Sequence, residues 1–420
     1  MLASPGHAGA RLFMFILKPL GDKRIGLLWS SQLLSATGAE FYMVAVIWIA
    51  SSLIGRDAGY VSALQSGALL FGSLFAGALT DRWRHATTMV GVSLFRAALL
   101  LLLAAASAFG FMSLPLLAVT AGAVALATSV YDPALQATLP ILAPGTSIRH
   151  AVNGLFDATR RMARILGPSL IALVNGLVPI GQFFAITAGG FLLSALGVRA
   201  ALKGAPLPAP PETRRGLSSV LDAIMGGSRA VRHHRLMHFG LIADFVGNVT
   251  WSMGVLLGMA LYLRMTSAEP LTAYSLMMTA YGAGNLAANL VLAGITPKRP
   301  LLWLVMSKLT FGLGVLLMPF APNTAALMAC AALAAVNGPF ENLALLHIIQ
   351  HDFPPQRIAQ VYRLQMCAVF GGSLIGYLAA PSLFAAFGLA PMIATLGAVT
   401  LATGLVGLAL SRLLHGPRPT

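Results

Sequence analysis

Residues 77–108 read GALTDRWRHATTMVGVSLFRAALLLLLAAASA, a short charged loop followed by a long apolar run. The run from 87 to 108 carries a single charged side chain, Arg96. An α-helix needs about 20 mostly apolar residues to cross the hydrocarbon core of a bilayer, and this run has that length. We therefore predict a membrane-spanning helix over 87–108.

Runs of similar length and composition recur along the chain. They predict transmembrane helices over 27–53, 59–79, 87–108, 114–138, 151–176, 180–202, 236–263, 272–295, 301–319, 323–347, 358–386 and 390–413. Hydrophobic residues make up 57% of the 420 residues and charged residues 9%, whereas about a quarter of a soluble domain is charged. A soluble fold of this length has too little interior to bury so much apolar surface. We predict an all-α membrane protein with twelve transmembrane helices, solvated by the lipid bilayer.

Basic residues gather on one side of the predicted spans. Nineteen fall there: Arg11, Lys18, Lys23, Arg24, Arg82, Arg84, Arg149, Arg199, Lys203, Arg214, Arg215, Arg229, Arg232, Arg235, Lys298, Arg299, Arg357, Arg412 and Arg418. The other side has two, Arg56 and Arg264. Because Lys and Arg concentrate in cytoplasmic loops, we expect both termini in the cytoplasm of a bacterial cell, with the chain in the inner membrane. The net charge of +15 reflects this loop pattern, so we expect no nucleic-acid partner.

The longest connection between spans, 203–235, divides the twelve helices into two sets of six. It opens with the Pro-rich stretch GAPLPAPPETRRG, after which Val220, Ile224 and Val231 have the spacing of one face of a surface helix. We expect an N-terminal bundle at 1–202, a cytoplasmic linker at 203–235 and a C-terminal bundle at 236–420. The halves repeat weakly, since the fourth helix of each ends near an acidic residue and the fifth carries arginine near its start.

Enzyme and metal motifs do not occur in the sequence. It has no zinc-ligand spacing, nucleophile elbow, phosphate-binding loop or dinucleotide fingerprint. The two cysteines, Cys330 and Cys367, fall inside apolar runs and are expected to be buried thiols. We predict a monomeric protein that is not an enzyme and needs no metal or cofactor.

The loop at 77–90 resembles the signature G-x-x-x-D-R-x-G-R-[RK] that the major facilitator superfamily carries between helices 2 and 3. Gly77, Asp81 and Arg82 match this signature, and Arg84 stands at its second glycine.

Further segments narrow the resemblance. The stretches at 131–142 and 151–170 are similar to the group of that superfamily with macrolide efflux pumps and the enterobactin exporter. The helix-packing motif G-P-x-x-x-G of the fifth helix is represented by Gly167 and Pro168, with Ala172 at its last position.

The resemblance implies two pseudo-symmetric six-helix bundles in which helices 1, 4, 7 and 10 line a central cavity. It also implies a secondary transporter working by alternating access, which exports a small amphipathic organic molecule, a siderophore or a drug, in exchange for protons. A proton-driven importer and a lysophospholipid flippase remain alternatives within transport. A membrane receptor is the alternative outside it.

Four acidic residues fall inside predicted spans: Glu40, Asp132, Asp244 and Glu341. An ionisable side chain at the centre of a spanning helix costs at least about 2.5–3.5 kcal/mol, so each needs a partner or a function. At about 1.5 Å per residue, Glu40 lies roughly 20 Å and Asp244 roughly 12 Å from the cytoplasmic end of its helix. Both depths are near the middle of the membrane, so Glu40 and Asp244 are the predicted proton-coupling residues.

Charged residues near the cytoplasmic helix ends are the predicted gate: Asp81, Arg82, Arg84, Asp132, Arg164, Glu341, Arg357 and Arg363. Asp81 is expected to meet the N-terminus of the helix that begins near Arg357, where the helix dipole favours an anion. Aromatic and amide residues are predicted to contact the substrate: Tyr42, Asn248, Trp251, Tyr281, Asn285, Asn337 and Phe340. Lys308, inside the span at 301–319, is expected to snorkel to the surface or to form an ion pair.

Overall fold

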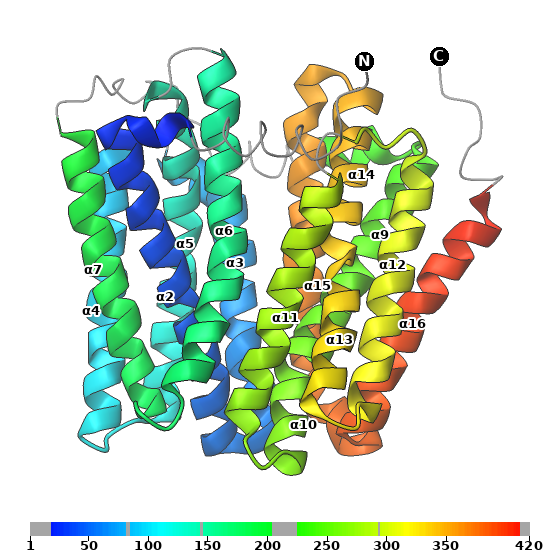
Figure 1. Ribbon diagram of the computed structural model, residues 1–420. Coiled ribbons are helices and arrows are strands. Elements are labelled where there is room, and N and C mark those ends of the chain that lie inside the picture. The colour runs from blue at the N-terminus through cyan, green and yellow to red at the C-terminus, as the bar shows by residue number, and fades with distance from the viewer. Residues whose placement is uncertain (1–17, 81–84, 143–145, 204–224, 293–294, 412–420) are drawn as a thin grey trace, which may run out of the picture. The chain divides into compact units, whose positions relative to one another are not determined.

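The computed structural model describes residues 18–80, 85–142, 146–203, 225–292 and 295–411, and their regular structure is helical throughout (Figure 1). Within a bilayer a helix satisfies its own backbone hydrogen bonds, which is why apolar runs of this length fold in this way. The first elements are η1 (Lys18–Gly21), α2 (Lys23–Ile54), η2 (Gly55–Ala58), α3 (Gly59–Thr80), α4 (His85–Ala108), α5 (Leu114–Leu142), α6 (Thr146–Val174), η3 (Ile180–Gln182) and α7 (Phe183–Leu202).

The remaining helices follow a short helix at 225–231. They are α9 (Arg235–Val249), η4 (Thr250–Gly258), α10 (Met259–Thr266), α11 (Pro270–Leu292), α12 (Pro300–Leu317), η5 (Met318–Phe320), α13 (Thr324–Ala335), α14 (Asn337–Asp352), α15 (Pro355–Phe387) and α16 (Leu389–Ala409). The linker segment 204–224, with Val220 and Ile224, lies outside the described residues. Val231 is buried in a core cluster with Met237 and Leu301.

Nine helical stretches of the described chain are long and apolar enough to cross a membrane. The first of them, Lys23–Phe75, contains both α2 and α3. Neither α6 nor α11 is among the nine. The reason lies in their sequences, because α6 carries several charged residues in its first half and α11 carries amide, hydroxyl and tyrosine side chains along its length.

Backbone contacts divide the chain into two compact units. One unit comprises Met1–Val46 and Phe75–Arg214, and the other comprises Ile47–Leu74 and Arg215–Thr420. The division after Arg214 falls inside the linker expected at 203–235. In addition, the end of α2 and most of α3 belong to the second unit, so α2 contributes residues to both.

In the first unit, small residues allow α2 and α7 to pack closely. A Cβ atom on Gly190 would lie 3.1 Å from the carbonyl oxygen of Leu34, and one on Gly38 would lie 3.2 Å from the Cα of Thr187. The Thr187 hydroxyl donates a 2.7 Å hydrogen bond to the Gly38 carbonyl oxygen. Such close backbone approach replaces the hydrophobic effect as the source of helix association in lipid.

In the second unit, α9, η4 and α10 form one continuous helical stretch whose central nine residues are π-helical. Helix α15 approaches this stretch closely, since a Cβ on Gly372 would lie 2.6 Å from the Phe245 carbonyl oxygen and one on Gly376 would lie 3.0 Å from that of Val249. Figure 1 shows α9 and α15 in this unit together with α12, α14 and α16. This packing brings polar residues of four helices together.

Candidate functional site

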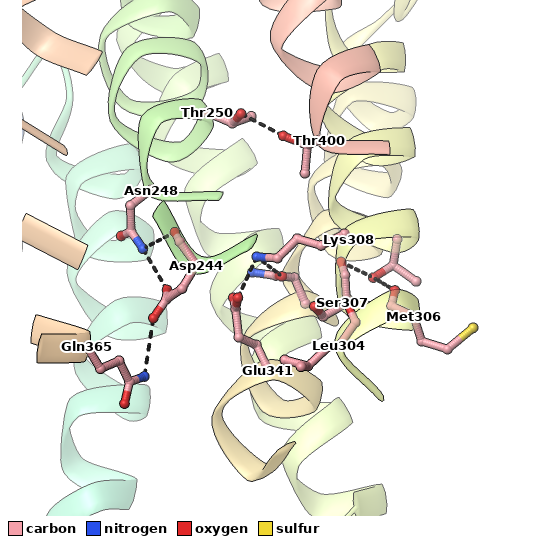
Figure 2. A network of polar contacts seen from close by, with 12 residues as sticks. Asp244, Asn248, Thr250, Leu304, Met306, Ser307, Lys308, Glu341, Gln365 and Thr400 are labelled. Carbon is pink, nitrogen blue, oxygen red and sulfur yellow. Dashed lines mark hydrogen bonds and ion pairs between the residues drawn. The ribbon is translucent and has the colours of Figure 1, made fainter. Parts of the chain in front are cut away.

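Polar side chains from α9, α12, α14 and α15 converge inside the second unit (Figure 2). Three of them are charged residues that are almost fully shielded from solvent: Asp244 is 5% exposed, Glu341 is 7% exposed and Lys308 is 0% exposed. Charges buried to this extent need partners, because their desolvation costs several kcal/mol each. We call this group, with Asn248, Asn337 and Gln365, the buried polar network.

Lys308 on α12 forms an ion pair with Glu341 on α14. Its Nζ lies 2.6 Å from Oε1 of Glu341 and also donates to Oδ1 of Asn337 at 3.5 Å. Asn337 and Glu341 are four residues apart on α14 and therefore share one helix face. Of the two arrangements expected for Lys308, the structure has the ion pair, and the side chain does not snorkel.

Asp244 on α9 accepts hydrogen bonds on both carboxylate oxygens. Asn248 Nδ2 donates to Oδ1 at 2.9 Å and to the Asp244 carbonyl oxygen at 2.8 Å, while Gln365 Nε2 donates to Oδ2 at 3.2 Å. Both partners are amides, which present either N–H groups or a carbonyl oxygen after rotating. They are therefore able to satisfy Asp244 in its ionised and in its protonated form.

The Lys308–Glu341 ion pair and the Asp244 carboxylate are linked electrostatically. Asp244 interacts with both Glu341 and Lys308. Lys308 Nζ also abuts α9 itself, because a Cβ on Gly247 would lie 2.5 Å from it. Figure 2 shows the lysine pointing from α12 toward Glu341, with Asp244 beyond it.

Further predicted substrate contacts lie in the same unit. The rings of Trp251 and Tyr281 pack in a tilted arrangement with centroids 4.6 Å apart. Asn285, one turn after Tyr281 on α11, is 3% exposed and donates to the Ala335 carbonyl oxygen at 3.2 Å. Phe340 packs edge-on against Trp303 of α12, with ring centroids 5.2 Å apart. Trp251 and Tyr281 thus form an aromatic pair, whereas Phe340 faces a different partner.

In the first unit, Glu40 on α2 lies against the Gly-Pro motif of α6. A Cβ on Gly167 would stand 2.7 Å from the Glu40 Cγ, so the glycine makes room for this side chain. Arg164, one turn earlier, interacts electrostatically with Glu40. Pro168 lies inside α6 and has no N–H, which leaves the Arg164 carbonyl oxygen without its intrahelical bond.

Tyr42, a predicted substrate contact, also lies on α2. Its hydroxyl donates to the Ala121 carbonyl oxygen at 3.5 Å.

Arg96, the single charge in the span at 87–108, is buried between aromatic rings. Its guanidinium carbon lies 4.1 Å from the Phe191 ring centroid and 4.7 Å from that of Tyr131. Nη1 donates to the Thr128 hydroxyl at 3.4 Å, and Gln32 donates to the Tyr131 hydroxyl. Cation–π contacts of this kind stabilise a desolvated cation by about 2 kcal/mol.

The predicted gate residues are only partly described. Asp81, Arg82 and Arg84 lie outside the described residues. Asp132, Arg164 and Arg357 are exposed, and Arg363 is half-buried. Glu341, which the sequence groups with the gate, is the member that joins the buried polar network.

Sequence reasoning missed one member of the network, Gln365, and did not identify the partner of another, Lys308. Gln365 gave no signal, because an amide on a long amphipathic helix is common. Lys308 stood out as a charge inside a span, but its partner lies 33 residues away on another helix, and nothing local identifies it.

A second polar cluster joins the end of α2 to α10. Arg264 Nη1 donates to the Trp48 carbonyl oxygen at 3.0 Å and to the Ser51 hydroxyl, and its guanidinium lies 5.7 Å from the Trp48 ring centroid. Arg264 and Arg56 both line a cavity of about 830 Å³. They are the two basic residues that the sequence places on the side opposite the other nineteen.

The chain matches the sequence model described as Major Facilitator Superfamily over residues 28–362. It is 28% identical over 410 residues to the multidrug efflux pump Tap of Mycobacterium tuberculosis and of Mycobacterium bovis, which covers 91% of this chain and 92% of the pump. Among solved structures, a POT family transporter in complex with a thioalcohol-conjugated peptide aligns with a TM-score of 0.74 and 12% identity, over 93% of this chain and 96% of that one.

A point mutant of the nucleoside transporter NupG aligns with a TM-score of 0.68 and 13% identity, over 93% of this chain and 100% of that one. At these identities the solved structures establish a shared fold and nothing about the substrate.

Proposed function

Since the chain belongs to the major facilitator superfamily and is a multi-span membrane transporter of small molecules, we propose that it exports a small amphipathic organic molecule in exchange for protons. The similarity to a multidrug efflux pump over nine-tenths of both chains supports the outward direction. A drug or a siderophore is the proposed cargo. The transporter is proposed to act as a monomer in the inner membrane of a bacterial cell.

The proposed architecture is twelve spans in two six-helix bundles. The nine apolar stretches account for ten of the proposed spans, because the first contains both α2 and α3. The polar helices α6 and α11 complete the twelve. An even number of spans agrees with the basic residues at both ends of the chain, which favour cytoplasmic termini.

The observation that carries the proton-coupling proposal is the set of partners around Asp244. A carboxylate buried in low dielectric is stable only if it is paired or neutral. Asn248 and Gln365 can hydrogen-bond to Asp244 in its ionised and its protonated form, because their amides can turn. Asp244 can therefore release and rebind its proton without leaving a buried polar atom without a hydrogen bond. Asp244 is therefore the proposed proton carrier of the second unit, and Glu40 is its proposed counterpart in the first.

The substrate is proposed to contact the aromatic pair of Trp251 and Tyr281, which belongs to the same unit as Asp244. Aromatic faces bind apolar and cationic groups, and Asn285 one turn away adds an amide. The π-helical segment that carries Trp251 directly follows α9. Local π-helices recur at functional sites of helices, where they widen the backbone.

Transport by purified protein in proteoliposomes tests the direction and the coupling. We propose three probes, namely ethidium, tetracycline and a catechol siderophore, with the membrane potential clamped at zero by valinomycin and equal potassium. Proton antiport predicts uphill accumulation of at least one probe when the lumen is acidic, and none in protein-free liposomes. Accumulation only with an alkaline lumen would instead identify a proton-driven importer, and movement of no probe under either gradient would overturn the proposal.

A further inference from the structure

The Lys308 side chain runs between two glycines of neighbouring helices. A Cβ on Gly404 of α16 would lie 3.2 Å from the Lys308 Cβ, and a Cβ on Gly247 of α9 would lie 2.5 Å from its Nζ. The first glycine lets α16 cover the base of the lysine, and the second leaves α9 open at its tip. The lysine ammonium therefore lies against α9 at Gly247, three residues after Asp244.

The buried polar network holds one cation and two carboxylates. Nζ of Lys308 is 2.6 Å from Oε1 of Glu341, while Asp244 has amide partners and interacts electrostatically with both charged residues. One cation neutralises one carboxylate, so the second must bind a proton or take the cation for itself.

The described parts of α9, α14 and α15 carry other titratable side chains, and none of these is among the groups that act on Asp244. They are Arg235 and His238 on α9, His347, His351 and Asp352 on α14, and Arg357, Tyr362, Arg363, Cys367 and Tyr377 on α15. Of the charged residues packed around Asp244, those that act on it are Lys308 and Glu341.

We propose that Lys308 is a mobile counter-cation that competes with the proton for Asp244. When Asp244 is protonated, the ammonium pairs with Glu341. When Asp244 releases its proton, the ammonium turns past Gly247 to lie between the two carboxylates, so that Asp244 and Glu341 share it. Lysine suits this role because its compact charge sits on a flexible four-carbon stem. The inference rests on the proposed function of Asp244 and makes Lys308 a positioning residue.

The proposal predicts opposite effects from removing each half of the ion pair. Lys308→Met removes the competitor, so Asp244 should keep its proton to a pH about 1–3 units higher, the size expected for loss of a nearby opposite charge. Glu341→Gln frees the ammonium for Asp244 and should move deprotonation to lower pH. Lys308→Arg retains the charge and should restore most of the wild-type profile.

Gly247→Ala tests the same idea without removing any charge or polar group. The added methyl would occupy the position next to Nζ and hold the ammonium away from α9. The pH at which Asp244 loses its proton should then rise, as in Lys308→Met. Gly240→Ala is the matched control, because it lies on the same helix and its methyl would meet a leucine side chain, Leu345, in place of the ammonium.

Infrared difference spectroscopy of the purified full-length transporter measures the protonated carboxyl band directly, without a substrate. The band lost in Asp244→Asn identifies Asp244, and its intensity is titrated in each variant. Shifts in the predicted directions, with Gly240→Ala unchanged, support the proposal. If Asp244 titrates alike in the wild type, Lys308→Met and Gly247→Ala, the counter-cation proposal is wrong while proton coupling at Asp244 stands. If no Asp244 band titrates at all, the proposed coupling itself fails and the counter-cation role falls with it.

Discussion

Nη1 of Arg264 donates a 3.0 Å hydrogen bond to the carbonyl oxygen of Trp48, across 216 residues of sequence. The same nitrogen donates to the Ser51 hydroxyl, and the guanidinium lies near the face of the Trp48 ring. One side chain thus fastens the end of α2 to the end of α10. Both attachment points belong to the second unit, although most of α2 belongs to the first.

Replacing Arg264 by Gln should destabilise this attachment. Loss of hydrogen bonds to a charged group costs about 1.5–3 kcal/mol each, and we expect a lower midpoint of thermal unfolding in detergent. Arg56→Gln is the matched control, since Arg56 is an exposed arginine lining the same cavity. An equal drop in both variants, or none in Arg264→Gln, would contradict the structural role of the hydrogen bonds.

Gly167→Ala should impair transport by displacing Glu40. The added methyl would stand 2.7 Å from the Glu40 Cγ, so either the carboxylate or α6 must move. We expect a loss of pH-driven probe accumulation of roughly tenfold or more, with normal expression, because misplacing a reacting group by about 1 Å can cost that much. Gly189→Ala, whose methyl would meet nothing within 4 Å, should behave as the wild type. Unimpaired accumulation by Gly167→Ala would separate Glu40 from the coupling mechanism.

Neutralising a proton carrier should abolish uphill transport and spare exchange. Asp244→Asn and Glu40→Gln keep the shape of each side chain but cannot release a proton. We expect both variants to lose pH-driven accumulation while they still exchange labelled for unlabelled probe at equal concentrations. Proton release on probe binding to purified protein is the deciding measurement, and wild-type release from both variants would show that neither residue carries the coupling.

The basic residues predict the orientation of the chain. With nineteen on one side and two on the other, reporter fusions at Thr420 and near Gly204 should report a cytoplasmic location. An alkaline phosphatase fusion active at either position, with green fluorescent protein dark at the same site, would reverse the topology and place Arg264 on the cytoplasmic side.

Asp81→Asn should weaken the closed state of the cytoplasmic side. If Asp81 meets the N-terminus of α15 near Arg357, the loss of its charge removes an interaction with the helix dipole worth about 0.3–1 kcal/mol. We expect reduced transport with near-normal expression, together with altered cysteine cross-linking between the loops. Wild-type transport and cross-linking would show that Asp81 is not a gate residue.

The sequence by itself determined that the protein is helical, membrane-embedded and a member of its superfamily, and it singled out Glu40, Asp244 and Glu341 as charges that need an explanation. The length of an apolar run and the charge of a loop depend only on residues that are neighbours in the sequence, so the sequence alone reveals them. The boundaries of α4 followed for the same reason, expected at 87–108 and found at His85–Ala108, whereas the span expected at 323–347 is two helices, α13 and α14.

Only the tertiary structure decided the partners of those charges. Lys308 pairs with Glu341, Gln365 reaches Asp244 across 121 residues, and Gly247 leaves the space beside the lysine tip. Which faces of two helices meet depends on their rotation and closeness, and these are set by small residues such as Gly372 packing against a distant backbone. A glycine within an apolar run looks the same in sequence whether it packs against lipid, a leucine or a buried ammonium, so the network became visible only when the helices were assembled.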